Sequence, residues 1–253
     1  MRIAANGALQ KTVEALLYDD QSPEAIAGWL RHQQRRLPSV SRDTIHRYIK
    51  SPYGRRVEAY RLRRRKRKGR KRSTTGRLAD RTFVDKRPAY INDRSRIGDS
   101  EGDFVVSGKN GHGVLLVIVD RKARTAFLER ILRPACTAVT DATQRIKERY
   151  PEWKTMTTDN DILFQHHKEL AETLGIKIYF CHPYHSWEKG SVENTNKHIR
   201  KTIPKGSDLS RYGKPFIKRL EAKLNRRIMK CLSYRTPTEV LTVHRKRKKR
   251  SRA

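Results

Sequence analysis

Cysteine is scarce in this chain of 253 residues, which contains only Cys136, Cys181 and Cys231. The three are far apart and no CxxC pair occurs, so the sequence indicates neither a disulfide framework nor a cysteine-ligated zinc site. We expect three thiols in a reducing compartment. Long apolar runs are also missing: there is no signal-peptide core and no apolar stretch of about 18 residues. We therefore expect a soluble intracellular protein that has no membrane partner.

Acidic residues are few, with 26 Asp and Glu against 59 Lys and Arg, which gives a formal net charge of +33 and a pI near 10.7. Such a surplus destabilises a compact fold by self-repulsion unless a polyanion neutralises it. Nucleic acid is the ordinary partner of a chain this basic. A ribosomal protein would share this charge, so the composition indicates a partner and not a reaction.

Composition divides the chain into four regions, and no internal repeat is present. We expect a helix-turn-helix domain at 1–55, a basic linker at 56–97, a catalytic core at 98–205, and a helical segment with a basic tail at 206–253. Within the linker, residues 61–72 (RLRRRKRKGRKR) contain ten basic side chains. Because such a block cannot bury a core, we expect it to be disordered or ordered only by DNA.

The first region has the signals of a small helical domain. Ser22 followed by Pro23 predicts a helix start, and Ser41 predicts the cap of a second helix. The pair is compatible with a helix-turn-helix, although the connection between the helices is longer than usual. On the outer face of the second helix, base edges and phosphates would meet Arg42, His46, Arg47 and Lys50. The alternative is a helical bundle whose basic face is only solvated.

The region from 98 to 205 alternates strands and helices. Apolar runs predict strands at 103–107, 113–119, 124–131, 154–159 and 176–180, and helices at 136–149, at 162–174 with Gly175 as its stop, and from Ser191 onward. A three-strand meander followed by alternating helices and strands is an α/β layout with a mixed five-stranded sheet. This order of elements matches the ribonuclease H-like fold, with helices flanking the sheet.

Three carboxylates stand where this layout would bring them together. Asp103 opens the first strand, Asp159 ends the fourth, and Glu193 lies in the first turn of the last helix. Ligands gather at the carboxyl ends of strands, and Asp103 faces Asp159 only if the first strand lies beside the fourth. Two-metal phosphodiester chemistry needs such oxygen ligands, with the ions about 4 Å apart. Each acid alone has an ordinary alternative: an edge-strand charge, a helix cap, or an i,i+4 pair of Glu193 with Lys197.

Other side chains compete for a place in that site. Glu101 shares a strand face with Asp103 if the strand starts that early. Asp120 closes the second strand, where Arg121 or Arg124 could pair with it. We rank both acids below the triad. The histidines show no HxxxH spacing, so we expect DNA contact for His185 and structural roles for His166, His167 and His182.

Longer segments resemble a known family. The runs TTDNDILF and CHPYHSWEKGSVENTNKHIRKTIPKGSDLS resemble the catalytic core of the insertion-sequence-thirty (IS30) family of bacterial DDE transposases, and 33 residues separate Asp159 from Glu193, as in that family. RPAYINDRSRIGDSEGDFVVSG resembles its segment around the first aspartate. QSPEAIAGWL and SVSRDTIHRYI resemble its DNA-binding helices, and LNRRIMKCLSYRTPTEVL resembles its carboxyl end. The similarity runs from about residue 20 to about residue 241.

The resemblance implies that Asp103, Asp159 and Glu193 bind two Mg²⁺ ions, with Mn²⁺ as an alternative. It implies double-stranded DNA as partner, both transposon ends and target, and a homodimer or higher oligomer on DNA in the bacterial nucleoid. Beyond the helix-turn-helix, the candidate DNA contacts are His185, Lys189, Asn194, Asn196, Lys197, Arg200 and Lys201. For Lys197, Arg200 and Lys201 a solvated basic face is the alternative.

The implied reaction is hydrolysis at a transposon end, followed by attack of the released 3′-hydroxyl on another phosphodiester, with no covalent enzyme intermediate. The sequence departs from the family at Ser100, where Trp is usual, and at Asp161, where Gly is common. We also expect the chain to lack the additional amino-terminal helix-turn-helix that longer relatives carry. Two other functions stay open: a non-catalytic DNA-binding regulator derived from a transposase, and a nuclease that does not join strands.

Overall fold

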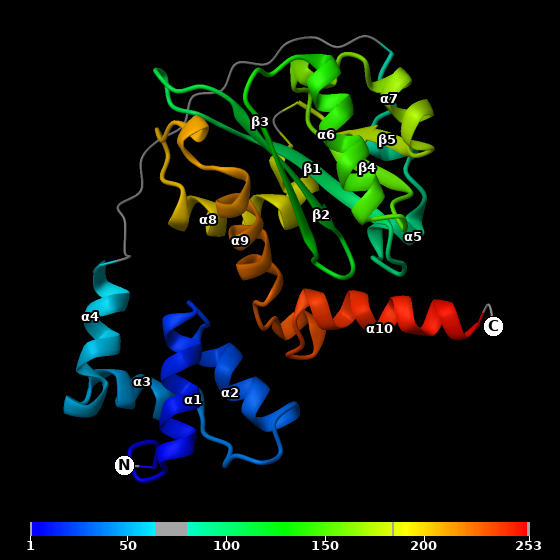
Figure 1. Ribbon diagram of the computed structural model, residues 1–253. Helices are drawn as coiled ribbons and strands as arrows, with labels where there is room; N and C mark the ends of the chain where they lie inside the picture. The colour runs from blue at the N-terminus through cyan, green and yellow to red at the C-terminus, as the bar shows by residue number, and fades with distance from the viewer. Residues whose placement is uncertain (1, 64–79, 184, 252–253) are drawn as a thin grey trace. The chain divides into compact units, whose positions relative to one another are not determined.

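A computed structural model of the chain describes residues 2–63, 80–183 and 185–251 (Figure 1). The chain divides into two compact units: Met1–Lys71 with Arg226–Ala253, and Arg72–Asn225. The region predicted at 206–253 is therefore divided: residues 206–225 belong to the second unit, and residues 226–253 belong to the first. Most of the basic block at 61–72 lies outside the described residues.

The first unit contains the helices α1 (Gly7–Tyr18), α2 (Pro23–His32), α3 (Arg42–Lys50) and α4 (Arg55–Arg63), with η1 (Pro52–Gly54) between the last two. Both predicted caps are present, since the hydroxyl of Ser22 accepts from the amide of Ala25 and that of Ser41 from the amide of Thr44. Ile26, Leu30 and Ile45 lie in the buried core of these helices, together with Leu9, Val13, Leu17, Tyr48 and Ile49.

The carboxyl-terminal part of the chain belongs to this helical unit, with η6 (Lys230–Leu232) and α10 (Pro237–Arg250). The side chain of Gln21 bonds the backbone of this part twice, to the carbonyl of Arg226 (3.3 Å) and from the amide of Ile228 (3.0 Å). The ring of Tyr234 stacks on His32 and lies so close to Gly28 that a Cβ there would be 1.9 Å from a ring carbon. Gly28 is thus required for this packing.

The second unit is built on a five-stranded mixed sheet of order β3-β2-β1-β4-β5. The strands are β1 (Asp99–Val106), β2 (Val114–Asp120), β3 (Ala126–Ile131), β4 (Thr155–Thr158) and β5 (Lys177–Phe180). β1 pairs antiparallel with β2 and parallel with β4. The first strand therefore lies beside the fourth, as the ribonuclease H-like layout requires, and the predicted fold class is confirmed.

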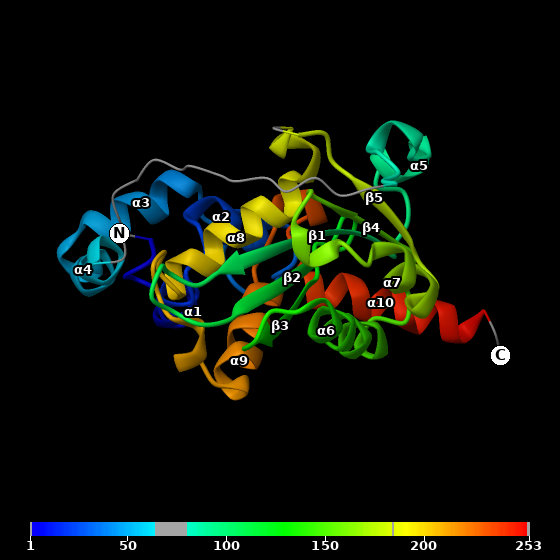
Figure 2. The ribbon, with the colours of Figure 1, turned by 90° about the horizontal axis from the view of Figure 1, so that it is seen from above.

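Helices cover both faces of the sheet (Figures 1 and 2). On one face, α8 (Gly190–Thr202) and α9 (Lys214–Asn225), with η5 (Leu209–Arg211) between them, enclose a core that includes Val105, Val117 and Ile199. On the other face lie α6 (Cys136–Arg149) and α7 (His167–Leu174), where the rings of Phe127 and Tyr150 stack. Two covered faces explain why every residue of β2 is buried.

Three local predictions differ from the structure. β1 begins at Asp99, four residues before the predicted strand, so Asp103 lies within the strand and does not open it. The predicted helix at 162–174 is divided into η3 (Ile162–Phe164) and α7, which ends at Gly175 in the left-handed conformation. Both described ends of the expected linker at 56–97 are structured: residues 56–63 belong to α4 of the first unit, and residues 80–97 of the second unit contain η2 (Val84–Lys86) and α5 (Ala89–Asn92). Phe83 pairs with Phe180 of β5.

None of the helices within the described residues combines the length and the apolar character needed to cross a lipid bilayer.

Candidate functional site

Alternate residues of β1 direct two carboxylates to the face of the sheet that α8 covers. Glu101 and Asp103 are two residues apart and share a face. Both contact α8 or the turn before it, η4 (Ser186–Lys189). Asp159 directly follows β4, the parallel neighbour of β1. The sheet thus brings Asp103 and Asp159 to one place, as the sequence predicted.

Lys189 joins these two aspartates. Its ammonium group lies 2.9 Å from an oxygen of Asp103 and 2.7 Å from an oxygen of Asp159, and only 6% of its side chain is exposed. Burial alone would lower the pKa of Lys189, but the charges of Asp103 and Asp159 raise it above its usual range. The ammonium is therefore the cation of this site. Lys189 is thus bound by two aspartates, and its contact with DNA stays a prediction.

Asn196 connects α8 to the same place, because its amide nitrogen donates to the second oxygen of Asp103. Glu193 precedes Asn196 by three residues in α8, so the two side chains lie on the same face of the helix. Glu193 is half-buried in the first turn of α8. This places the third predicted carboxylate on the helix face that carries the contact with Asp103.

The oxygen atoms of the site fit a hard divalent cation. Among the described residues, Oδ1 of Asp159 and Oδ1 of Asn196 are buried and have no hydrogen-bond partner. Carboxylate and amide oxygens are the donors that Mg²⁺ takes in proteins, together with water and substrate phosphate. The ammonium of Lys189 stands where such an ion would be held between the aspartates. Among the described residues, Asp103, Asp159 and Glu193 do not form a group with ligand atoms within 4.8 Å of one another.

Glu101 positions α8. One of its oxygens accepts from the backbone amides of Ser191 (2.6 Å) and Val192 (2.9 Å), and the other pairs with Arg121 at 2.7 Å. The carboxylate is fully buried and binds the amides that the first turn of a helix leaves unpaired. Glu101 is thus a structural anchor beside the site and not a competing metal ligand. The sequence signal that could have revealed this role is the alternation of Glu101 with Asp103.

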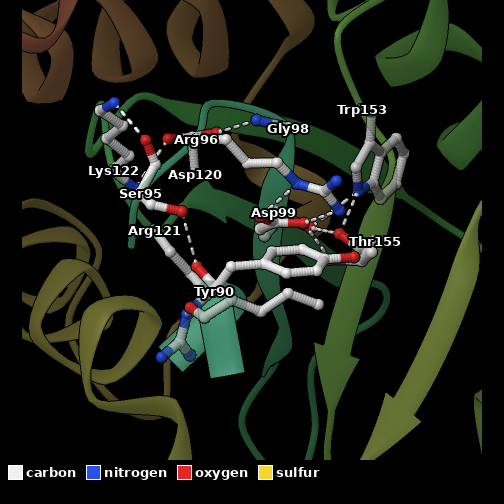
Figure 3. A network of polar contacts seen from close by, with 12 residues as sticks. Tyr90, Ser95, Arg96, Gly98, Asp99, Asp120, Arg121, Lys122, Trp153 and Thr155 are labelled. Atoms are coloured by element: carbon white, nitrogen blue, oxygen red, sulfur yellow. Dashed lines mark hydrogen bonds and ion pairs between the residues drawn. The ribbon is translucent and has the colours of Figure 1, made fainter. Parts of the chain in front are cut away.

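A second polar network fixes the start of β1 (Figure 3). Asp120 accepts from the amides of Gly98 (2.8 Å), Lys122 (2.9 Å) and Ala123 and from the hydroxyl of Tyr150. Backbone amides and a hydroxyl therefore satisfy this carboxylate, in place of the pairing with Arg121 or Arg124 that the sequence left possible.

Asp99, in the same network, binds the guanidinium of Arg96 with both oxygens at 2.9 Å and accepts from Thr155 at 2.8 Å. Ser100, one of the departures from the family pattern, accepts from the indole nitrogen of Trp153 at 2.7 Å. These contacts bind β1 to the segment that enters β4 and so fix the strand that carries Asp103.

The predicted DNA-reading face of α3 is exposed. Ile45, Tyr48 and Ile49 are buried beneath it. The side chains that the sequence placed on the outside are all exposed: Arg42, His46, Arg47 and Lys50. Arg42 forms an ion pair with its neighbour Asp43 at 3.2 Å.

On α8 the remaining candidates for DNA contact differ in exposure. Asn194, Lys197 and Lys201 are exposed. Arg200 is half-buried and donates to the carbonyls of Val106 (3.0 Å) and Pro204 (3.3 Å). Its guanidinium therefore bonds the backbone, and its contact with a phosphate stays a prediction.

The chain is similar to several insertion-sequence transposases. It is 36% identical to the transposase for insertion sequence element IS4351 of Bacteroides fragilis over 241 residues, which is 92% of this chain and 72% of that one. It is 32% identical to the transposase for IS1086 of Cupriavidus metallidurans, over 95% of this chain and 74% of that one. Transposase InsI for IS30A of Escherichia coli is also 32% identical, over 92% of this chain and 64% of that one.

Among solved structures, the catalytic core domain of BIV integrase aligns over 60% of this chain and 97% of its own, with a TM-score of 0.47 and 19% identity. No family profile matches the chain.

Proposed function

This chain belongs to the IS30 family of insertion-sequence transposases, and from that premise we propose that Asp103, Asp159 and Glu193 are the metal-binding triad of a DNA strand-transfer site. Enzymes of this class act on DNA with divalent metal ions. The observation that carries the proposal is the convergence of Asp103 and Asp159 on one buried cation, beside the helix that bears Glu193.

In this proposal Asp103, Asp159 and Glu193 provide oxygen ligands for Mg²⁺ or Mn²⁺, two ions to a site. When bound, these ions would supply charge stabilisation for the phosphodiester and a lowered pKa for the attacking water. Asn196 holds one oxygen of Asp103 in place. Glu101 fixes the start of α8 and with it the position of Glu193. The chain's own work is to position ligands, since oriented reactants account for much of such catalysis.

The substrate is proposed to be a transposon end, cleaved to release a 3′-hydroxyl that is then joined to target DNA in the nucleoid by a dimer or larger oligomer. The test is a labelled duplex carrying the terminal repeat of the element, incubated with Mg²⁺ and target plasmid. Nicked and joined products are both expected. Nicks without joining would favour the nuclease alternative, and binding without either product would favour the non-catalytic regulator.

Lys189 is expected to compete with metal for the two aspartates. In Lys189→Met, without divalent ions, two carboxylates face each other with no cation. We expect a loss of about 2–3 kcal/mol of unfolding free energy, somewhat less than for a fully buried pair because Asp159 is partly exposed. Added Mg²⁺ should recover more of the melting temperature in this variant than it adds to the parent chain. Thermal unfolding with chelator and with Mg²⁺ measures both effects.

The matched control is Lys168→Met, which removes an exposed lysine paired with Asp80 at 2.9 Å. It should change stability little, with or without Mg²⁺. If Mg²⁺ raised the melting temperatures of the two variants equally, Lys189 would not compete with a metal ion for Asp103 and Asp159.

We further propose that α3 reads DNA. Arg47→Ala is expected to weaken binding to the terminal repeat by about 1 kcal/mol or more, and to lower the salt slope of log K by about 0.9 if the contact is to a phosphate. Binding measured at several salt concentrations checks this. Lys11→Ala removes an exposed charge from α1 of the same unit and should leave the slope unchanged. Equal effects of both variants would support a merely solvated basic face.

A further inference from the structure

Two histidines and a glutamate converge in the loop between β5 and α8. Nδ1 of His182 lies 3.1 Å from Oε1 of Glu188, and Nδ1 of His185 lies 3.4 Å from the same oxygen. One ligand atom from each residue falls within 4.8 Å of the other two, and among the described residues no other group of histidine, cysteine or acidic side chains does so. The triad proposed for strand transfer has no part in this cluster.

The spacing matches the coordination shell of a small transition metal. Tetrahedral zinc with bonds of about 2.0–2.1 Å separates neighbouring ligand atoms by about 3.3 Å. The two observed separations, 3.1 and 3.4 Å, fall on either side of that value. Three protein ligands leave a fourth position for water, which is the arrangement of open zinc sites.

A second observation concerns the other nitrogen of His182. Nε2 lies 2.8 Å from a carboxylate oxygen of Asp85, in η2. A metal-bound histidine almost always gives its remaining N–H to a carboxylate, carbonyl or water, which fixes the ring and strengthens it as a ligand. His182 also stacks on Phe83, with ring centroids 5.1 Å apart. The stacking on Phe83 and the contact of Nε2 with Asp85 together fix the orientation of the imidazole ring.

Charge and donor type favour a different metal from that of the aspartate pair. With neutral imidazoles, Glu188 and Asp85 leave two negative charges around the cluster, which suits a divalent cation. Imidazole nitrogen is a ligand for zinc and related transition metals, whereas Mg²⁺ takes oxygen. The ligands therefore discriminate between ions.

We propose that His182, His185 and Glu188 form a zinc-type metal site, supported by Asp85, that is separate from the strand-transfer site. The bound ion would hold together the loop after β5, in which Glu188 directly precedes Lys189. The contact of Asp85 with His182 would connect this loop to η2. The proposal does not depend on the assignment of the catalytic triad.

The test uses the full chain, freed of metal with a chelator and titrated with Zn²⁺ by calorimetry in the presence of millimolar Mg²⁺. One Zn²⁺ per chain is expected. Co²⁺ in its place should give the intense visible absorption of a four-coordinate site. His185→Asn should lower the Zn²⁺ affinity at least about tenfold. Asp85→Asn should lower it about 10–100-fold, as is usual for a carboxylate that accepts the remaining N–H of a metal-bound histidine.

His166→Asn is the matched control, because His166 pairs with Glu169 three residues on, at 3.3 Å, without a second histidine. It should leave the affinity unchanged, as should Asp159→Asn. Circular dichroism establishes that each variant is folded, and Co²⁺ absorption of the unmutated chain is independent of any substitution. Absence of Zn²⁺ binding by the unmutated chain would overturn the proposal, and so would equal losses in His166→Asn or Asp159→Asn.

Discussion

Glu101→Ala is expected to cost the sheet unit at least about 4 kcal/mol of unfolding free energy. Breaking a buried ion pair costs about 3–5 kcal/mol because it leaves an uncompensated charge, and each orphaned amide adds to that loss. Here the substitution removes the carboxylate that pairs with the guanidinium of Arg121, whose side chain is only 6% exposed. It also leaves the amides of Ser191 and Val192 without an acceptor. Denaturant unfolding, followed by fluorescence and circular dichroism, measures the loss.

Two further variants separate this explanation from general loss of a charge. Glu169→Ala removes an exposed carboxylate of α7 and should change stability by well under about 1 kcal/mol. Glu101→Met combined with Arg121→Met removes both buried charges and should recover much of the stability, because apolar pairs often replace buried ion pairs without loss. A double variant as unstable as the single one would mean that the amides of α8, and not Arg121, account for the effect.

The sequence predicted those parts of the fold that local chemistry determines. Ser22 and Ser41 cap helices because their hydroxyls reach amides three residues on, and Gly175 ends α7 because it adopts a positive φ. The succession of apolar runs indicates the order of strands and helices along the chain, whereas the place of the fourth strand beside the first was taken from the matching ribonuclease H-like fold. The helix caps and the helix end need no knowledge of distant partners.

The start of β1 could not be predicted from polarity. Asp99 and Glu101 are acids that a sequence pattern assigns to a loop, yet both are fully buried. Their partners, Thr155 and Arg121, are 56 and 20 residues away. Only the folded sheet brings these side chains to Asp99 and Glu101, so the predicted strand began four residues late.

Lys189 shows the same limit for the candidate site. In a chain with 59 Lys and Arg residues, the pattern cannot distinguish a lysine that two aspartates bind from those that face solvent. The assignment of residues from Arg226 onward to the amino-terminal unit was missed for a related reason, since Gln21 bonds the backbone of Arg226 across 205 positions. Long-range polar contacts leave no periodicity in the sequence.

Glu193→Gln is expected to reduce strand cleavage by about three orders of magnitude or more, because a metal-binding carboxylate underlies several kcal/mol of transition-state stabilisation. Glutamine keeps the size of the side chain and its place in α8, so affinity for the terminal repeat should stay within about threefold of the parent value, a difference of under 1 kcal/mol. Single-turnover cleavage and equilibrium binding to the same duplex give the two quantities. Glu172→Gln, on the exposed side of α7, is the control and should cleave normally.

A loss of cleavage alone does not distinguish a metal ligand from a residue that stabilises α8. Glu193→Cys makes that distinction, since a thiolate binds Mn²⁺ more readily than Mg²⁺ and the two ions should then differ as cofactors. Cleavage by this variant should return in part with Mn²⁺ and stay absent with Mg²⁺, whereas a purely structural role predicts the same deficit with either ion. Full activity of Glu193→Gln would exclude this carboxylate from the site, and the pair of aspartates around Lys189 would then need another partner.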